Sequence, residues 1–314
     1  MVHSLLLSEQ MNPSISVIIP VRNGALTLAQ AVNSVLDQTY PAREIIVIDD
    51  NSTDSTPQIL DSFGAKIKVL QGFGKGAGPA RNLGIEASTS EYIAFLDSDD
   101  VWVAEKLESQ LPHLSQGVVV GAYSTYVSGD NFRRVGTSIR TGNDSAANLM
   151  LINREAMPSL LSTWVLKKSD IEKNGLFDPR YLVAQDYEFI MRLVAAGLRM
   201  VVVRKQLVLY RLHAISETSS GYVQQYLTAH YVRKDIKESS GLELDEWLKE
   251  AYSEKKLFRS ALAGFHFRKA LVATGSSRTY HLVLANAVIS AFLGPQDFIR
   301  KFRRQGPKFR SSAK

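Results

Sequence analysis

Residues 14–50 read SISVIIPVRNGALTLAQAVNSVLDQTYPAREIIVIDD, and their pattern determines the predicted architecture. Residues 14–20 and 44–48 are apolar, β-branched runs that are typical of buried strands. Between them, residues 27–38 carry apolar side chains at the three- and four-residue spacing of an amphipathic helix. A strand, a helix and a second strand at this pitch predict a right-handed βαβ unit with parallel strands.

The alternation continues beyond this unit. Further helices are expected at residues 55–63 and 79–87, and further strands at 67–70 and 92–96. This order predicts an α/β fold with a mostly parallel sheet and flanking helices. Later residues are more mixed, with strands expected at 118–126 and 199–210, a helix at 187–196 closed by Gly197, and a helical pattern from residue 222 onward.

Composition restricts the chemistry. The chain has 314 residues and no cysteine, so disulfides and thiolate metal sites are excluded and a metal must bind oxygen or imidazole. The apolar run at residues 281–293 is shorter than the roughly 20 residues that a membrane-spanning helix needs.

The positive charge is concentrated at the C-terminal end. Residues 294–314 hold seven basic residues and one acid, which accounts for the whole formal net charge of +6. Their basic side chains alternate with Phe298, Phe302 and Phe309, which suits either an anionic membrane surface or a disordered, solubilising tail. The remainder of the chain is close to neutral, which disfavours a nucleic-acid partner.

The strongest chemical signal is at residues 92–100, which read YIAFLDSDD. Asp97, Asp99 and Asp100 follow a buried strand within four residues, and their mutual repulsion is costly unless a cation or hydrogen-bond donors neutralise them. Mg²⁺ and Mn²⁺ prefer carboxylate oxygens and often share their coordination with substrate phosphates. The alternative, that Asp99 and Asp100 cap a helix starting near residue 103, accounts for one or two of the acids only.

A second acidic group is found at residues 45–56, which read IIVIDDNSTDST. An acid at the end of the second strand of a doubly wound sheet commonly binds ribose hydroxyls or a base, which points to Asp49 and Asp50. Asp54 or Ser55 is expected to cap the next helix.

The glycine-rich residues 72–77, GFGKGA, match a dinucleotide-binding pattern only loosely and follow the third strand rather than the first. A flexible loop that leads to Arg81 is the preferred interpretation, with Arg81 either contacting a phosphate or forming a surface salt bridge.

Taken in order, these motifs resemble those of family 2 glycosyltransferases, which have the GT-A fold. The matching motifs are SVIIPVRN (16–23), VIDDNS (47–52), ARNLG (80–84), LDSDD (96–100), GLFD (175–178), QDYE (185–188) and YRLH (210–213). The resemblance covers residues 14–219. It implies a catalytic domain over that range, with a nucleotide-binding half at 14–110 and an acceptor half at 111–219. A disordered leader at 1–13, a helical region at 220–293 and a basic tail at 294–314 would surround it.

The resemblance implies a nucleotide site formed by Pro20, Val21, Asn23, Asp49, Asp50, Arg81, Asp97 and Ser98. In that site the backbone of Pro20 and Val21 and the Asp50 carboxylate would contact the nucleobase, usually uracil. Arg81 would approach the phosphates and Asp97 the ribose. Asp99 would ligate Mn²⁺ or Mg²⁺, and His213 is either a further metal ligand or an ordinary histidine.

On the acceptor side, Asp186 matches the catalytic base of the family, although it could instead be the N-cap of the helix that follows. Gln185 stands where the family usually has Glu, which affects acceptor contacts rather than the base. Trp164 either lines the acceptor site or belongs to the core.

We therefore expect an inverting glycosyltransferase that moves a sugar from a nucleotide-diphosphate sugar, usually a UDP-sugar, to a glycan or lipid-linked acceptor. One in-line displacement needs a base on the acceptor side and neutralisation of the leaving diphosphate on the other side. The expected location is the cytoplasm, with the tail on the inner face of the membrane. The alternatives are a sugar nucleotidyltransferase, for which residues 20–24 (PVRNG) make a poor phosphate loop, and a degenerate nucleotide-sugar-binding module.

Overall fold

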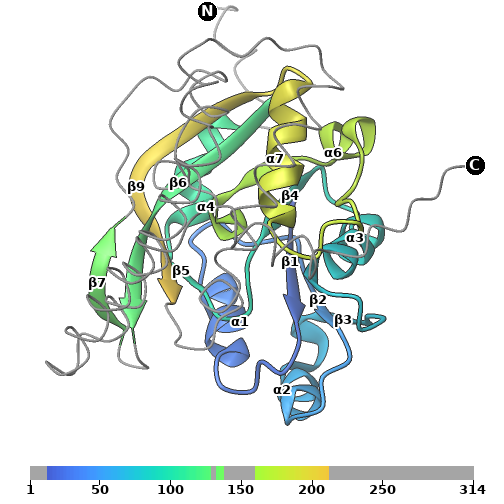
Figure 1. Cartoon of the computed structure of the whole chain (residues 1–314). Coiled ribbons are helices and arrows are strands. Elements are labelled where there is room, and N and C mark those ends of the chain that lie inside the picture. The colour runs from blue at the N-terminus through green and yellow to red at the C-terminus, as the bar shows by residue number, and fades with distance from the viewer. Residues whose placement is uncertain (1–12, 129–131, 138–159, 212–314) are drawn as a thin grey trace, which may run out of the picture.

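The computed structural model describes residues 13–128, 132–137 and 160–211 (Figure 1). The predictions for the leader, the helical region at 220–293, the basic tail and His213 fall outside these residues. Within the described part, no helix is long and apolar enough to cross a membrane.

The N-terminal half of the sheet is the predicted βαβ arrangement. Its strands are β1 (Ile15–Val21), β2 (Glu44–Asp49), β3 (Lys68–Gln71) and β4 (Tyr92–Phe95), and its connecting helices are α1 (Leu28–Leu36), α2 (Thr56–Phe63) and α3 (Ala77–Ala87). The strands pair in parallel in the order β3-β2-β1-β4. Every residue of β1 is buried, as expected for a central strand that is covered on both faces.

The second half of the sheet is mixed. It consists of β5 (Val101–Trp102), β6 (Val118–Ser128), β7 (Arg133–Thr137), β8 (Val165–Lys167) and β9 (Arg199–Arg211). β8 runs antiparallel to β4 and β6, whereas the long strands β6 and β9 lie side by side in parallel (Figure 1). The complete order is β3-β2-β1-β4-β8-β6-β9-β5, with β7 paired to β6. Most paired residues lie in parallel ladders, which confirms the predicted α/β class.

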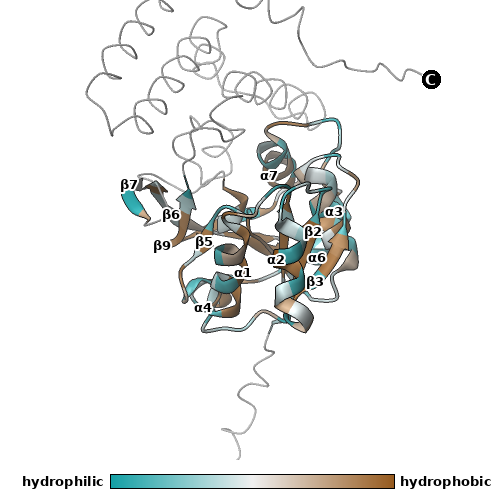
Figure 2. Cartoon of the chain, turned by 90° about the horizontal axis from the view of Figure 1, so that it is seen from below, coloured by the Kyte–Doolittle hydropathy of each residue, from teal (hydrophilic) through white to brown (hydrophobic). Residues whose placement is uncertain are grey.

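The sheet separates two hydrophobic cores because successive strand side chains point to opposite faces. Val17 and Ile19 point into the core beneath α1, α2 and α4 (Lys106–Gln110), whereas Ile18 points into the core beneath α3, α6 (Lys168–Asn174) and α7 (Gln185–Ala195). Figure 2 shows the apolar colour concentrated on the strands and the polar colour on the outward sides of the helices. The short 3₁₀ turns are η1 (Gly64–Lys66), η2 (Leu111–His113) and η3 (Leu161–Thr163).

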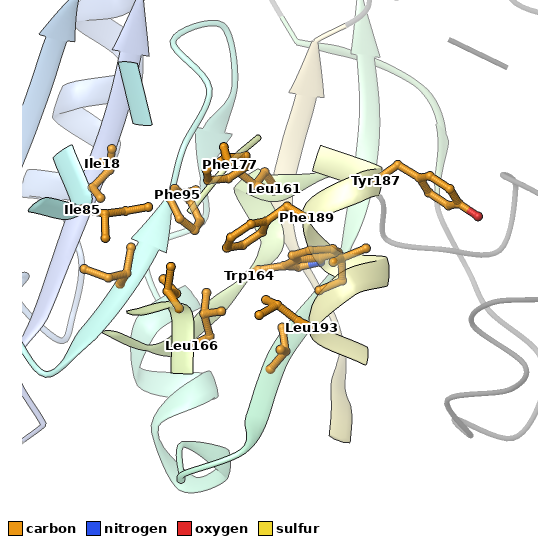
Figure 3. Close-up of a cluster of buried hydrophobic side chains, with 14 of the residues drawn as sticks. Ile18, Ile85, Phe95, Leu161, Trp164, Leu166, Phe177, Tyr187, Phe189 and Leu193 are labelled. Carbon is orange, nitrogen blue, oxygen red and sulfur yellow. The ribbon is translucent and has the colours of Figure 1, made fainter. Parts of the chain in front are cut away.

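Three phenylalanines fix α7 against the sheet (Figure 3). The rings of Phe177 and Phe189 stack at a centroid distance of 4.1 Å, and Phe95 of β4 meets Phe177 edge-on at 5.6 Å. Such pairs contribute about 0.5–1.5 kcal/mol each beyond the area that they bury. The stack therefore fixes α7 relative to β4.

α7 ends before Gly197, the glycine that was predicted to close it. Gly197 has a φ of 92°, and its N–H donates to the carbonyl of Val194 at 2.9 Å. The N–H of Leu198 donates to the carbonyl of Leu193 at 3.1 Å, which completes a glycine-terminated cap.

Candidate active site

The carboxyl ends of β1, β2 and β4 meet at one edge of the sheet, where polar side chains collect. Val21 pairs with Asp49 at the ends of β1 and β2, and the Asp50 N–H donates to the Val21 carbonyl at 2.8 Å. Pro20 and Val21 are both buried there. In open α/β sheets this edge is where ligands bind.

Asp50 is the centre of the glycine-rich loop. Its buried carboxylate accepts the N–H of Gly74 at 2.8 Å and the N–H of Gly76 at 2.7 Å, one on each oxygen. A Cβ added to Gly72 would lie 2.6 Å from Asp50 Oδ1 and 2.9 Å from Asp50 Cα, so the close approach requires glycine. The loop at 72–76 is therefore built around a carboxylate of the protein itself, which supports the rejection of a dinucleotide fingerprint.

The loops that follow β1 and β2 are tied together. Asn23 has a φ of 54°; its N–H donates to Ser52 Oγ at 2.8 Å, and its Oδ1 accepts the Thr53 N–H at 2.8 Å. Asp49 Oδ1 accepts the Ser52 N–H at 2.9 Å. The Asn23 side-chain oxygen is therefore bonded within the protein, and the two loops are held close together at this edge of the site.

The N-cap position of α2 is Ser55, and Asp54, one residue earlier, bonds the first N–H of the helix. Its Oδ1 accepts the N–H of Thr56, the first residue of the helix, at 2.9 Å, and its Oδ2 accepts the Ala25 N–H at 3.1 Å. Ser55 makes no side-chain cap bond.

Arg81 of α3 is buried and forms an ion pair with Asp97, which is half-buried. Its Nη2 lies 2.6 Å from Asp97 Oδ1, and its guanidinium carbon lies 5.5 Å from the centroid of the Phe177 ring. Arg81 Nε is buried and, within the described part of the chain, has no hydrogen-bond partner. Arg81 thus brings a desolvated positive charge to the end of β4.

Asp100 is fully buried. Ser162 Oγ donates to its Oδ2 at 2.6 Å, and the Arg211 N–H donates to its Oδ1 at 3.2 Å. Burial, together with the charges of Asp99 and Asp97, raises the pKa of Asp100 well above its usual value, and the two hydrogen bonds oppose that rise.

The structure excludes the alternative in which Asp99 and Asp100 cap a helix that starts near residue 103. β5 follows the turn directly because Val101 and Trp102 pair with β9, and α4 begins only at Lys106, with Glu105 as its N-cap.

The acidic turn, residues 97–100, can contribute to a cation site without forming one alone. In the described residues, no group of three or more Asp, Glu, His or Cys side chains is arranged to hold a metal ion. Mg²⁺, however, is usually bound by one or two carboxylates plus substrate phosphates. Asp99 and Ser98 are half-buried in the turn, so the residues present fit a cation shared with a diphosphate.

Gln185 and Asp186, which were predicted to lie on the acceptor side, are the first two residues of α7. Asp186 is half-buried in its first turn, and its Oδ1 accepts the Tyr187 N–H at 2.8 Å. The N-cap position belongs to Ala184, with a φ of 55°, and not to Asp186. Gln185 Oε1 occupies the space where a side chain on Gly78 would lie, so α3 and α7 begin beside each other.

Asn82 joins two of the sequence motifs. Its Nδ2 donates to the Phe177 carbonyl at 2.8 Å, and its Oδ1 accepts the Phe177 N–H at 2.9 Å. The segment that leads to α7 is thereby attached to α3 at the residue that directly follows Arg81.

Trp164 is fully buried in the core beneath α7 (Figure 3). It follows η3 and directly precedes β8, and this position carries its ring under the helix. Of its two interpretations, the structure supports the core residue.

Two residues of the site were missed in the sequence. Ser162 belongs to no motif, and Arg211 lies within one but received no role. The signal that pointed to them was the cluster of three acids, which requires donors from elsewhere in the fold.

Comparisons with known proteins find relatives of this chain. The family model "Glycosyl transferase family 2" matches residues 16–171. The Escherichia coli UDP-Glc:alpha-D-GlcNAc-diphosphoundecaprenol beta-1,3-glucosyltransferase WfaP is 31% identical over 211 residues, which are 66% of this chain and 81% of WfaP. WfgD, an Escherichia coli enzyme of the same description, is 39% identical over 114 residues, 36% of this chain and 45% of WfgD. An uncharacterized glycosyltransferase of Haemophilus influenzae is 35% identical over 163 residues, 47% of this chain and 65% of that protein.

The chain thus spans less than two thirds of the length of several of these relatives. Among solved structures, S. aureus TarS 1-349 in complex with UDP-GlcNAc superimposes with a TM-score of 0.61 at 21% identity. That match covers 95% of this chain and 93% of TarS 1-349, and it shows a shared fold.

Proposed function

The chain belongs to glycosyl transferase family 2, and from this we propose that it transfers a sugar from a UDP-sugar to a lipid-linked acceptor with inversion at the anomeric carbon. The observation that carries the proposal is the convergence at one sheet edge of Asp50, the Arg81–Asp97 pair and the acidic turn. Asp186 lies in the first turn of α7, which begins beside the first turn of α3.

A uridine nucleotide fits Asp50. The carboxylate has four acceptor positions, and the two glycine N–H groups use one on each oxygen, so it can still accept the imino N–H of uracil. The relatives WfaP and WfgD are named for UDP-Glc, and TarS was solved with UDP-GlcNAc. We assign Pro20, Val21, Asn23, Asp49 and Ser98 to the surroundings of the same nucleotide.

The diphosphate is assigned to Arg81 and the acidic turn. Arg81 already pairs with Asp97, and its buried Nε–H remains as a donor. Asp99 would hold Mn²⁺ or Mg²⁺ together with the phosphates; when bound, the cation neutralises the charge of the leaving UDP. His213 is proposed as a further ligand.

Asp186 is assigned as the general base that takes the proton of the acceptor hydroxyl. A half-buried carboxylate in the first turn of a helix is favoured in its ionised form by the helix dipole, which a base requires. Gln185 is placed at the same acceptor side.

The acceptor is proposed to be a lipid-linked sugar diphosphate. WfaP and WfgD are named for GlcNAc-diphosphoundecaprenol. Residues 294–314 would assist by docking on anionic lipid, because they combine seven basic residues with aromatic ones. Co-sedimentation with phosphatidylglycerol vesicles should decrease for a chain that ends at Gly294, and equal binding of both chains would exclude this role.

The donor is tested by a thermal-shift series. UDP-glucose, UDP-GlcNAc, GDP-mannose and UDP would each be added to the full chain, with Mn²⁺ or with EDTA. A ligand at 100 times its Kd stabilises the folded state by about 2.7 kcal/mol. We expect UDP-sugars to raise the Tm in Mn²⁺. The proposal would be contradicted if only GDP-mannose raised the Tm, or if none of the nucleotides did.

A further inference from the structure

We propose that Ser162 and Arg211 are positioning residues that hold the acidic turn from two sides and set the direction of the Asp99 side chain. The inference rests on the proposed function, because it concerns how the turn binds a divalent cation and a diphosphate. Neither residue is placed in contact with the reacting groups.

Ser162 closes the turn at both of its ends. Its Oγ accepts the N–H of Asp97 at 3.1 Å and donates its own proton to Asp100 Oδ2 at 2.6 Å. One buried hydroxyl thus joins the first and the last residue of the turn. At 2.6 Å the bond to Asp100 lies at the short end of the usual range for O–H···O hydrogen bonds.

The segment that carries Ser162 is itself held in place. The carbonyl of Ser162 accepts the Trp102 Nε1–H at 2.8 Å, and the carbonyl of Thr163 accepts the Gln110 Nε2–H at 2.9 Å. Trp102 and Gln110 are buried on β5 and α4. The hydroxyl of Ser162 therefore has a fixed origin, which a positioning group requires.

Arg211 holds the turn from the opposite side. It is the last residue of β9, and its backbone N–H donates to Asp100 Oδ1 at 3.2 Å. Its side-chain Nε donates to the Asp99 carbonyl at 3.1 Å, and its Nη2 donates to Gln30 Oε1 of α1 at 2.5 Å. A single arginine thus fixes the Asp99 backbone, the Asp100 carboxylate and the position of β9 relative to α1.

These contacts act on the residue between them. Asp97 is paired with Arg81 and tied to Ser162, and Asp100 is tied to Ser162 and Arg211. Because Asp97, Asp100 and the carbonyl of Asp99 are all held, we infer that the side chain of Asp99 leaves the turn in a defined direction. Partners that orient a metal ligand in this way typically change metal affinity 10- to 100-fold when they are removed.

The test is a calorimetric titration of Mn²⁺ into the full chain in the presence of UDP, with UDP binding in EDTA measured separately. Ser162→Ala should weaken Mn²⁺ about 10-fold or more and leave UDP affinity in EDTA unchanged. A role in folding alone would lower both affinities or neither.

Ser16→Ala is the matched control. Ser16 is equally buried and also donates to a carboxylate at 2.6 Å, that of Glu44, but it lies near the amino end of β1, away from the turn. It should bind Mn²⁺ as the wild-type chain does.

If Ser162→Ala does not fold, Arg211→Lys serves in its place, because lysine keeps the charge and the backbone N–H but cannot reach the Asp99 carbonyl and Gln30 together. The same loss of about 10-fold is expected. Wild-type Mn²⁺ affinity in the folded variant, or an equal loss in Ser16→Ala, would overturn the inference and leave the proposed function intact. Failure of the wild-type chain to bind Mn²⁺ with UDP would instead overturn both.

Discussion

The donor side and the acceptor side of the site are built differently. On the donor side, Asp50, Asp97 and Asp100 each accept bonds from residues far away in the sequence, and two of the three are buried. On the acceptor side, Asp186 is half-buried and accepts the N–H of the residue that follows it. The carboxylates of the proposed donor side are therefore held by bonds from distant segments, whereas this bond of Asp186 lies within its own helix.

The helix that carries Asp186, α7, is attached through apolar contacts and through side-chain hydrogen bonds to backbone carbonyls. Phe189 of α7 stacks on Phe177, and Arg192 donates to the carbonyls of Gly175 and Leu176 at 2.8 Å each while pairing with Glu188. Donor binding and transfer are therefore expected to be separable: damage to α7 should impair transfer while the nucleotide still binds.

The largest expected effect separates the two sides directly. Asp186→Asn removes the proposed base and keeps the shape of the side chain, so transfer should fall by about 10²- to 10⁴-fold. UDP affinity in Mn²⁺ should stay within about twofold, because the donor carboxylates are unchanged. Sugar transfer from UDP-glucose and calorimetry would be compared, and transfer at the wild-type rate would show that another group is the base.

Gly72→Ala should damage the donor side alone. The new Cβ would lie 2.6 Å from Asp50 Oδ1 and 2.9 Å from Asp50 Cα, so the carboxylate or the loop must move. We expect UDP to bind about 10-fold more weakly and stability to fall by about 1–3 kcal/mol.

Gly84→Ala is the control for this change. Its Cβ would lie 2.6 Å from an Ile18 side-chain carbon, in the core rather than at the site. The Gly84→Ala variant should lose stability without a change in UDP affinity. An equal loss of UDP affinity in both variants would show that the Asp50 loop has no specific role in binding UDP.

Phe189→Leu should weaken the attachment of α7 by about 1–2 kcal/mol, since a fully buried stacked ring is replaced by a smaller side chain. We expect Phe189→Leu to have a several-fold lower kcat with unchanged UDP binding. A parallel loss of UDP affinity would mean that the two sides are not separable.

The smallest effect concerns a residue outside both sides. Lys106 is fully buried, with its Nζ 2.8 Å from Gln110 Oε1 and 3.9 Å from the centroid of the Trp102 ring, and burial lowers its pKa well below the usual value. Between that lowered pKa and about 10.4, the unfolded chain binds a proton that the folded chain does not, so the contribution of Lys106 to stability rises with pH.

Lys106→Met should remove this rise and leave UDP affinity unchanged. Urea unfolding of the wild-type chain and of Lys106→Met at several alkaline pH values measures how steeply the free energy of unfolding rises with pH. Identical slopes would show that Lys106 keeps its proton in the folded state.

The same division explains what the sequence could predict. β1 to β4 and α1 to α3 were predicted to within two residues at each end, because each is a local apolar pattern between turn residues. Asp50 and Asp97 could be found because they directly follow such strands.

The short strands β5 and β8 were missed, since two or three residues carry no pattern of their own and become strands only by pairing with β9, β4 and β6. For the same reason the roles of Ser162 and Arg211 could not be predicted. Each contacts the acidic turn from a segment more than 60 residues away in the sequence.

The central claim is that the acidic turn binds UDP through a shared cation ligated by Asp99. It is tested most directly by calorimetric titration of UDP, with Mn²⁺ and with EDTA, into the wild-type chain and Asp99→Ala. We predict that Mn²⁺ tightens UDP binding by about 10-fold or more in the wild-type chain and leaves it unchanged in Asp99→Ala. The claim is contradicted if the wild-type chain binds no UDP, or if Asp99→Ala retains the full effect of Mn²⁺.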